Sequence, residues 1–486
     1  MMTHRHQLCA GPLSTAGLTR REMLSRTGFG LGGIALADML SSNARASEGG
    51  LAGLPHFAPK AKRVIFLFMS GGPSQFESFD YKPVLNKRSG EELPTSFRKG
   101  KPLPGMAGAQ NAFPLVGSPY KFSQRGQSGA WVSELFPETA KVVDDLCFIK
   151  SMSSEAVNHD PALTLMQTGA QLPGRPSIGA WVNYGLGTDN KDLPGFIVLV
   201  TKKGADQPLS CRLWDSGFLP TQYQGVQFRA GKEPVLFLSE PSGIAREDTR
   251  RMLDGLRELH QQELAVRADA AINARIEQYE MAYRMQASVP DVTDVSKESD
   301  KTLEMYGPDA KTPGSFAANC ILARRLAEQN VKFIQLYHPG WDHHGGLTNN
   351  YPGMAQEVDR PCAALIQDLK QRDMLKDTLV VWGGEFGRTS YSQGTFTSKS
   401  QSYGRDHHRE CFTFWMAGGG IKSGITYGES DDIGFDIANN PVTVNDFHAT
   451  LLHLLGVDHE RLTFRFQGRD FKLTDLAGKV VKGILA

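Results

Sequence analysis

The sequence has no excess of charge of either sign, because 53 lysine and arginine residues stand against 52 aspartate and glutamate residues in a chain of 486. A protein that works on nucleic acid or on an anionic membrane needs a basic surface, so this balance argues against both classes of partner. Long apolar runs are also missing, and no stretch after residue 46 reaches the roughly 20 residues needed to cross a bilayer. The remaining composition is that of a globular protein.

Cysteine is scarce and poorly spaced for a cross-linked scaffold. Five of the six cysteines follow residue 46, and no C-x-x-C motif occurs. This excludes the common zinc and redox motifs that depend on that spacing. The odd number argues against a disulfide framework among the five cysteines Cys147, Cys211, Cys320, Cys362 and Cys411.

The first 46 residues differ from the rest and predict an export signal. Arg20-Arg21 precedes an uncharged, glycine-rich run over 28–37, and Ala44-Arg45-Ala46 provides an A-x-A cleavage site. We therefore expect recognition by the twin-arginine export machinery, cleavage after Ala46, and a mature protein that is periplasmic or secreted and has no membrane span. Residues 28–33 also fit G-x-G-x-x-G, but no strand precedes them, so a dinucleotide site and a redox enzyme built on it are disfavoured.

Short apolar runs alternate with helical patterns along the mature chain. Runs bounded by glycine or charge predict buried parallel strands over 64–69, 196–200, 331–337, 378–382 and 411–416. Apolar residues at spacings of three and four predict helices over 131–145, 315–329, 354–372 and 444–455. This alternation predicts an α/β fold, with a mostly parallel sheet and helices on both faces.

Two stretches interrupt the alternation and are interpreted as insertions into one domain over 47–486. Residues 89–123 are rich in glycine, proline and lysine and predict a surface excursion. Residues 247–285 predict a long charged helix, and a linker rich in proline, aspartate and serine leads on to Asp300.

Polar residues gather where the predicted strands end, which is where ligand sites form in a parallel sheet. Five of the eleven histidines after residue 46 fall in two loops, 338–346 and 404–409, and Glu385 follows the strand at 378–382. Asp342 and His344 are two apart in extended chain, so their side chains project to one side and can share an ion. Carboxylate with imidazole is a ligand set for Zn²⁺ or a similar ion, whereas the alternative is a hydrogen-bonded loop with surface histidines. Glu385 is a candidate ligand, a general base or a carboxylate at a helix N-terminus.

Six motifs in this order resemble the signature of the exported bacterial domain-of-unknown-function family 1501, which is similar to the alkaline phosphatase and sulfatase superfamily. They cover nearly the whole mature chain: Gly71-Gly72-Pro73-Ser74, Phe79-Asp80-Tyr81-Lys82-Pro83, Asn158-His159, Trp341-Asp342-His343-His344, Gly384-Glu385-Phe386-Gly387-Arg388-Thr389 and Gly404-Arg405-Asp406-His407. The resemblance implies an alkaline phosphatase or sulfatase-like fold with metal ions and a nucleophile at the ends of the strands.

The resemblance assigns Asp342 and His344 to the first metal site and His407 as its last histidine, and Glu385 matches the aspartate of an adjoining Asp-His pair. We therefore expect the ligands Asp342, His344, Glu385 and His407. His159 occupies the place of the Cys or Ser nucleophile, Phe386 replaces a histidine, and Ser70-Gly71 stands where the first strand normally ends in aspartate. The expected cofactor is a divalent metal, Zn²⁺ first, with Ca²⁺, Mg²⁺ or Mn²⁺ as alternatives.

The leading hypothesis is an exported, metal-dependent hydrolase of a phosphate or sulfate ester, with metal-bound water as the nucleophile. Its substrate is an anionic small molecule or a sulfated or phosphorylated glycan. His159, Glu385 and Arg388 are the candidate catalytic residues: His159 as a further ligand or general acid, Glu385 as a base, and Arg388 or Arg405 as an oxyanion holder, unless the arginines are structural. The alternative is a non-catalytic metal- or glycan-binding protein that kept the fold.

Overall fold

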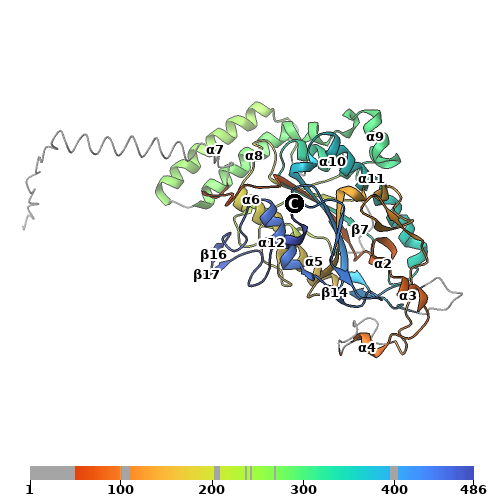
Figure 1. Ribbon diagram of the computed structural model, residues 1–486. Helices are drawn as coiled ribbons and strands as arrows, with labels where there is room; N and C mark the ends of the chain where they lie inside the picture. Colours follow the sequence, from red (N-terminus) through yellow and green to blue (C-terminus); the bar gives the residue numbers. More distant parts are fainter. Residues whose placement is uncertain are drawn as a thin grey trace, which may run out of the picture. The chain divides into compact units, whose positions relative to one another are not determined.

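A nine-stranded sheet forms the centre of the protein (Figure 1). The computed structural model describes residues 50–98, 100, 110–201, 208–231, 233–235, 238–240, 243–267, 270–394 and 403–486, so the predicted export signal lies outside the described residues. The strand order is β12-β4-β11-β8-β1-β7-β5-β6, with β15 also paired to β4. The strands are β1 (Arg63–Ser70), β4 (Leu146–Ser153), β5 (Phe196–Val200), β6 (Val226–Phe228), β7 (Phe333–Pro339), β8 (Thr378–Gly383), β11 (Phe412–Ala417), β12 (Ile425–Tyr427) and β15 (Val442–Thr443).

The sheet is parallel except at β11, which runs antiparallel to both of its neighbours, β4 and β8. The prediction of a mostly parallel α/β sheet is therefore confirmed, whereas the prediction that 411–416 is a parallel strand is wrong. An apolar run shows that a strand is buried but does not show its direction, because that depends on the connection. Since β11 opposes both β4 and β8, those two strands run the same way and end at the same edge.

Helices cover both faces of the sheet, as predicted. On one face α10 (Phe316–Glu328) and α11 (Leu347–Gln371) pack on alternate residues of β1 and β7 such as Leu67 and Leu336. On the other face α5 (His159–Thr168), α6 (Ile178–Leu186) and α12 (Val444–Leu454) pack on Phe66 and Tyr337. The period-2 alternation of strand side chains thus supplies two separate apolar cores.

The helices predicted over 315–329 and 444–455 are present as α10 and α12, and α11 begins earlier than predicted and contains Pro352 and Pro361. The helix predicted over 131–145 is wrong. That segment holds the strand β3 (Ala130–Ser133) and two short 3₁₀ turns, η2 (Thr139–Lys141) and η3 (Val143–Asp145). Pro137 cannot continue a helical hydrogen-bond ladder, and the Asp359 carboxylate instead accepts hydrogen bonds from the N–H groups of Glu138 and Thr139.

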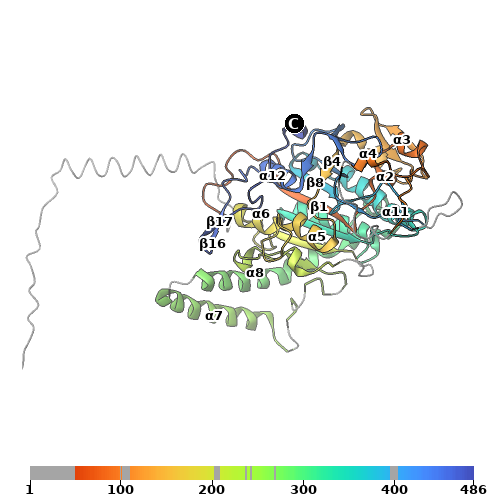
Figure 2. The same cartoon turned by 90° about the horizontal axis from the view of Figure 1, so that it is seen from below.

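The single long helix predicted over 247–285 is wrong, because this region forms an antiparallel pair of helices, α7 (Arg246–Arg267) and α8 (Ala270–Thr293), at one side of the sheet (Figure 2). The predicted linker is wrong in its first part, because α8 continues through Pro290 to Thr293. In the described part of the 89–123 excursion, Leu93 and Leu115 join a small third core with Tyr391. No helix among the described residues is both apolar and long enough to span a bilayer.

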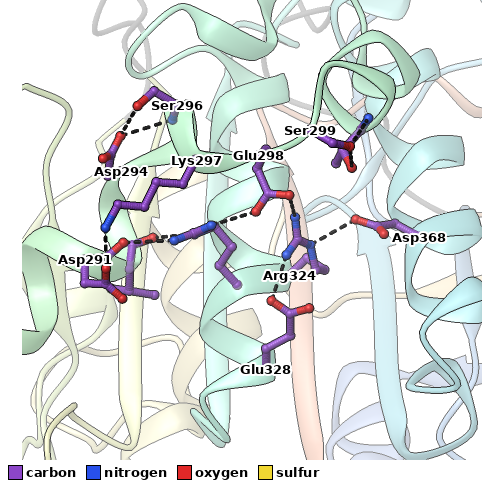
Figure 3. Close-up of polar contacts among 12 residues, drawn as sticks. Asp291, Asp294, Ser296, Lys297, Glu298, Ser299, Arg324, Glu328 and Asp368 are labelled. Atoms are coloured by element: carbon purple, nitrogen blue, oxygen red, sulfur yellow. Dashed lines mark hydrogen bonds and ion pairs between the residues drawn. The ribbon is translucent and has the colours of Figure 1, made fainter.

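A buried ion-pair network joins the end of α8 to α10 and α11 (Figure 3). Its centre is Arg324, whose side chain is 1% exposed. The guanidinium nitrogens of Arg324 lie 2.7 Å from Glu298, 2.7 Å from Glu328 and 2.9 Å from Asp368. Arg325 also lies 2.7 Å from Glu298, and Arg372 lies 2.7 Å from both Glu328 and Asp368, so three arginines meet three carboxylates and their charge is compensated within the protein.

Candidate metal centre

Four loops meet at the carboxyl edge of the sheet. The loop after β7 carries Asp342 and His344, and the loop after β8 carries Glu385 and Arg388. His407 lies in the short strand β10 (His407–His408), which pairs antiparallel with β9 (Gly387–Arg388). His159 begins α5 just beyond the end of β4. Because β4, β7 and β8 run in one direction, residues far apart in sequence reach the same edge.

The loops bring together His159, Asp342, His344 and His407, each of which offers one ligand atom within 4.8 Å of the others. The Nε2 atoms of His344 and His407 lie 2.9 and 3.2 Å from Asp342 Oδ1. Nε2 of His159 lies 3.1 Å from the second oxygen, Asp342 Oδ2. Nε2 of His344 is also 3.0 Å from Nε2 of His407. Two imidazole nitrogens at that separation need a proton or a cation to satisfy both of them.

The other ring nitrogen of each histidine has its own partner. Nδ1 of His407 lies 2.8 Å from the Val157 carbonyl oxygen, which can only accept, so this nitrogen carries the proton and Nε2 has the free lone pair. Nδ1 of His159 lies 2.6 Å from Glu385 Oε1, and Nδ1 of His344 contacts the side-chain oxygen of Gln393. Histidine that ligates a metal characteristically donates its second N–H to such an acceptor. The three rings therefore have the orientation that they would need to hold a metal ion.

Glu385 lies behind His159 and outside the group of four. Its carboxylate is fully buried and accepts the Gly71 N–H at 2.9 and 3.2 Å in addition to the contact with His159. The structure thus brings three of the four predicted ligands together, adds His159 to them, and positions Glu385 to orient that histidine. Gly71 has φ +116° and a Cβ there would lie 2.7 Å from Asp342 N, so the loop needs glycine at this position.

Arg388 is buried and holds Asp342 from the protein side. Its Nη2 donates to Asp342 Oδ1 at 2.6 Å, while Nε and Nη1 donate to the carbonyls of Gly72 and Arg405 at 2.8 and 3.0 Å. Arg405 is likewise buried and pairs with Glu77 at 2.8 Å. Of the two roles considered for these arginines, the geometry favours the structural one over binding a substrate oxyanion.

The neighbouring histidines of the two His-His pairs turn elsewhere. His408 Nε2 lies 2.7 Å from the Phe435 carbonyl oxygen, and the His343 ring packs on Tyr351 with centroids 5.7 Å apart. In β10 successive side chains point to opposite faces, which explains why only His407 reaches the centre.

The charges in the centre shift the pKa values of the histidines in opposite directions. Burial alone would lower the pKa of His159, but hydrogen bonds to Asp342 and Glu385 raise it to about 9. Burial lowers the pKa of His407 to about 4. Burial opposes ionisation of Asp342, but the hydrogen bonds from His159, His344 and His407 hold its pKa far below the usual range. Without a cation, one proton on His159 between two carboxylates therefore compensates the charge of the centre.

Sequence reasoning missed two groups that support the centre, Gln393 and the Val157 carbonyl. Neither carries a signal of its own, since Gln393 stands in none of the motifs and forms a β-bridge with Gly404, and a backbone carbonyl has no residue signature. Both are contacts across long stretches of chain, 49 and 250 residues from their histidines.

Comparisons with known proteins give one family and several distant structures. A family model described as "Protein of unknown function (DUF1501)" matches residues 61–485. No curated protein matches the chain. Among solved structures, the chain is similar to the PsFucS1 sulfatase from Pseudoalteromonas sp. (12% identity, 82% of this chain and 68% of that one, TM-score 0.33). It is also similar to alkaline phosphatase from the Antarctic bacterium TAB5 (12%, 77% and 96%, 0.30) and to the phosphonate monoester hydrolase SpPMH from Silicibacter pomeroyi (13%, 66% and 68%, 0.25).

Proposed function

The chain belongs to the DUF1501 family, and from that premise we propose that this member is a metal-dependent hydrolase of a phosphate or sulfate ester. The observation that carries the proposal is the convergence of three imidazole Nε2 atoms and one carboxylate, with each Nδ1 held by a separate acceptor. This donor set fits a divalent ion of the Zn²⁺ type.

Asp342, His344 and His407 would hold the ion, and His159 with Glu385 would serve the chemistry. When bound, the ion supplies a Lewis acid and lowers the pKa of water. The division of roles follows the contacts: His344 and His407 both touch Asp342 Oδ1, whereas His159 touches Oδ2 and is backed by Glu385 at 2.6 Å. A catalytic zinc site keeps three protein ligands and one open position, which this division provides.

His159 then holds a proton at Nε2 and can give it to the departing alcohol of an ester. Glu385 accepts from Nδ1 and stabilises the protonated ring, as the raised pKa of His159 indicates. Since His159 stands where the resemblance places a Cys or Ser nucleophile, we take water as the nucleophile, with no covalent intermediate on the protein. The anionic ester is the substrate class that the sequence resemblance implies.

The experiment compares metal content with turnover on a panel of phosphate and sulfate esters. His159→Ala and Glu385→Gln should keep at least most of the metal while kcat falls roughly 10²- to 10⁴-fold, the range for loss of general acid–base help. His459→Ala, a buried histidine outside the cluster, is the matched control and should leave both unchanged.

Trapping a phosphorylated or sulfated residue would refute the direct attack of water. Loss of the ion in His159→Ala would make His159 a fourth ligand instead.

If all four donors bind the ion, a second function is favoured. Four protein ligands close a tetrahedral site and leave no place for substrate, which is the pattern of a structural ion. We propose in that case a non-catalytic metal-stabilised binding protein for anionic glycans, exported through the twin-arginine route. A stoichiometric ion with no turnover on the whole panel would favour this alternative.

A further inference from the structure

The outer face of α7 exposes large apolar side chains, which favours a partner on this face. Met252 is 58% exposed and Leu259 is 62% exposed, and both are large apolar side chains. Gly255 lies between them in the middle of the helix, with nothing within 4 Å of where a Cβ would stand. In both views α8 lies between α7 and the sheet, so this face points away from the rest of the protein (Figures 1 and 2).

The inner and outer faces of α7 separate cleanly by helical position. Arg250 and Arg257 reach Glu280 of α8, and Arg246 lies 4.8 Å above the Tyr283 ring. At 100° per residue, Met252, Gly255 and Leu259 lie roughly opposite those arginines. They recur at spacings of three and four, the a/d seam of a two-helix contact. The α8 contacts therefore leave this seam unpartnered.

We propose that α7 docks antiparallel on α7 of a second copy of this chain. The charged residues beside the seam identify a second copy as the partner. Arg251 and Glu258 lie seven residues apart on the same flank of the seam. In an antiparallel pair, like flanks face each other, so Arg251 of each copy meets Glu258 of the other, twice. In the same register Met252 of each copy lies over the bare backbone at Gly255 of the other. A parallel pair would place like flanks apart and would lose both ion pairs.

The contact is self-complementary but small. A helix of 22 residues is about 33 Å long, so two such helices give an interface at the low end of specific contacts. Arg251 has a local partner in Asp248 in the single chain, and both side chains are largely exposed at 77% and 46%. Arg251 can therefore leave Asp248 and pair with Glu258 of the second copy at little cost in free energy. We expect a reversible dimer whose population rises with concentration.

Charge reversal tests the antiparallel register by sedimentation equilibrium on the full chain. Arg251→Glu and Glu258→Arg should each weaken association at least about 10-fold, because two attractive pairs become repulsive. The double variant Arg251→Glu/Glu258→Arg should restore it. A chain that stays monomeric at all concentrations overturns the proposal, as does a double variant no better than the single ones.

A cysteine experiment fixes which residues meet. In a Cys211→Ser background, a mixture of Met252→Cys and Gly255→Cys chains should form a disulfide-linked pair under mild oxidation. Leu476→Cys, which is 90% exposed but lies elsewhere, is the matched control and should not link to either. Equal linking by the control would overturn the assignment of α7 as the contact. Unchanged thermal unfolding of each variant shows that the fold is intact.

Discussion

Two buried polar clusters differ in how their charges are satisfied. Around Arg324 three carboxylates lie 2.7 to 2.9 Å from one guanidinium, and Arg325 and Arg372 pair with the same carboxylates (Figure 3). Around Asp342 one carboxylate lies among three imidazoles, and two of their Nε2 atoms face each other at 3.0 Å. The first cluster is balanced by its own arginines, whereas the converging lone pairs of the second need a proton or a cation between them. The comparison teaches that the direction of the donors, more than the number of charged residues, separates a candidate metal centre from an ion-pair network.

The largest effect expected to separate the two clusters is on metal content. His344→Ala removes a donor from the centre, so metal affinity should fall by more than the roughly 10- to 100-fold that outer-shell changes cost. Glu298→Gln, in the Arg324 network, should leave metal content unchanged. Elemental analysis of the purified proteins after metal-replete growth measures both. Metal loss in Glu298→Gln, or full retention in His344→Ala, would break the distinction.

The next effect should fall on stability alone. Arg324→Met removes one arginine from each of Glu298 and Asp368, which keep Arg325 and Arg372, respectively, at 2.7 Å, so the free energy of unfolding should fall by less than the roughly 3–5 kcal/mol of a fully broken buried pair. Metal content per folded molecule should not change. Denaturant unfolding with elemental analysis of the native fraction tests this, and a cost below about 1 kcal/mol would show that the network contributes little.

The smallest effect concerns pH in the metal-free protein. The pKa of His407 is about 4 in the fold against 6.5 for an ordinary histidine, so the unfolded chain binds more protons between these values. Stability should therefore fall as pH drops from about 6.5 to about 4, by about 3 kcal/mol for this residue. The pKa of His159 is raised to about 9, so its contribution is present below pH 6.5 and is lost as pH rises through 9.

Unfolding of chelator-treated protein over that range measures the acid-side slope. A His407→Asn variant, whose amide can still donate to Val157, should have a shallower slope but keep the part due to buried His448, whose pKa is also about 4. An identical slope in wild type and variant would contradict the assignment.

The sequence predicts the sheet better than the elements around it. Strands β1, β5 and β8 carry unbroken apolar runs and β7 has one broken only by Gln335, and such a run has one main explanation, burial between two layers. Strand β4 was not predicted, since Lys150 and Ser151 interrupt its run. The direction of β11 was wrong because direction depends on connections that local pattern does not encode.

The residues of the candidate centre also differ in how well the sequence predicts them. Asp342 and His344 can be predicted from their spacing at a strand end, and His407 and His159 only through the resemblance. The place of Glu385 could not be predicted, because whether a strand-end carboxylate reaches an ion or a histidine depends on about 3 Å of side-chain position. For Arg388, the burial of its guanidinium and its hydrogen bonds to Asp342 and to backbone carbonyls separate the structural role from anion binding, and the sequence shows neither.

The long sequence separations within the centre have a consequence for how the protein folds. The contacts that orient its rings join residues 226 and 250 positions apart. Contacts between residues so far apart in sequence form late, because closing the long loops between them loses chain entropy before the contacts stabilise the fold. The ion-binding geometry then exists only once β4, β7, β8 and β10 have all taken their places. Uptake of the proposed ion should therefore mark the end of folding, so that a chain whose sheet is incomplete would not bind it.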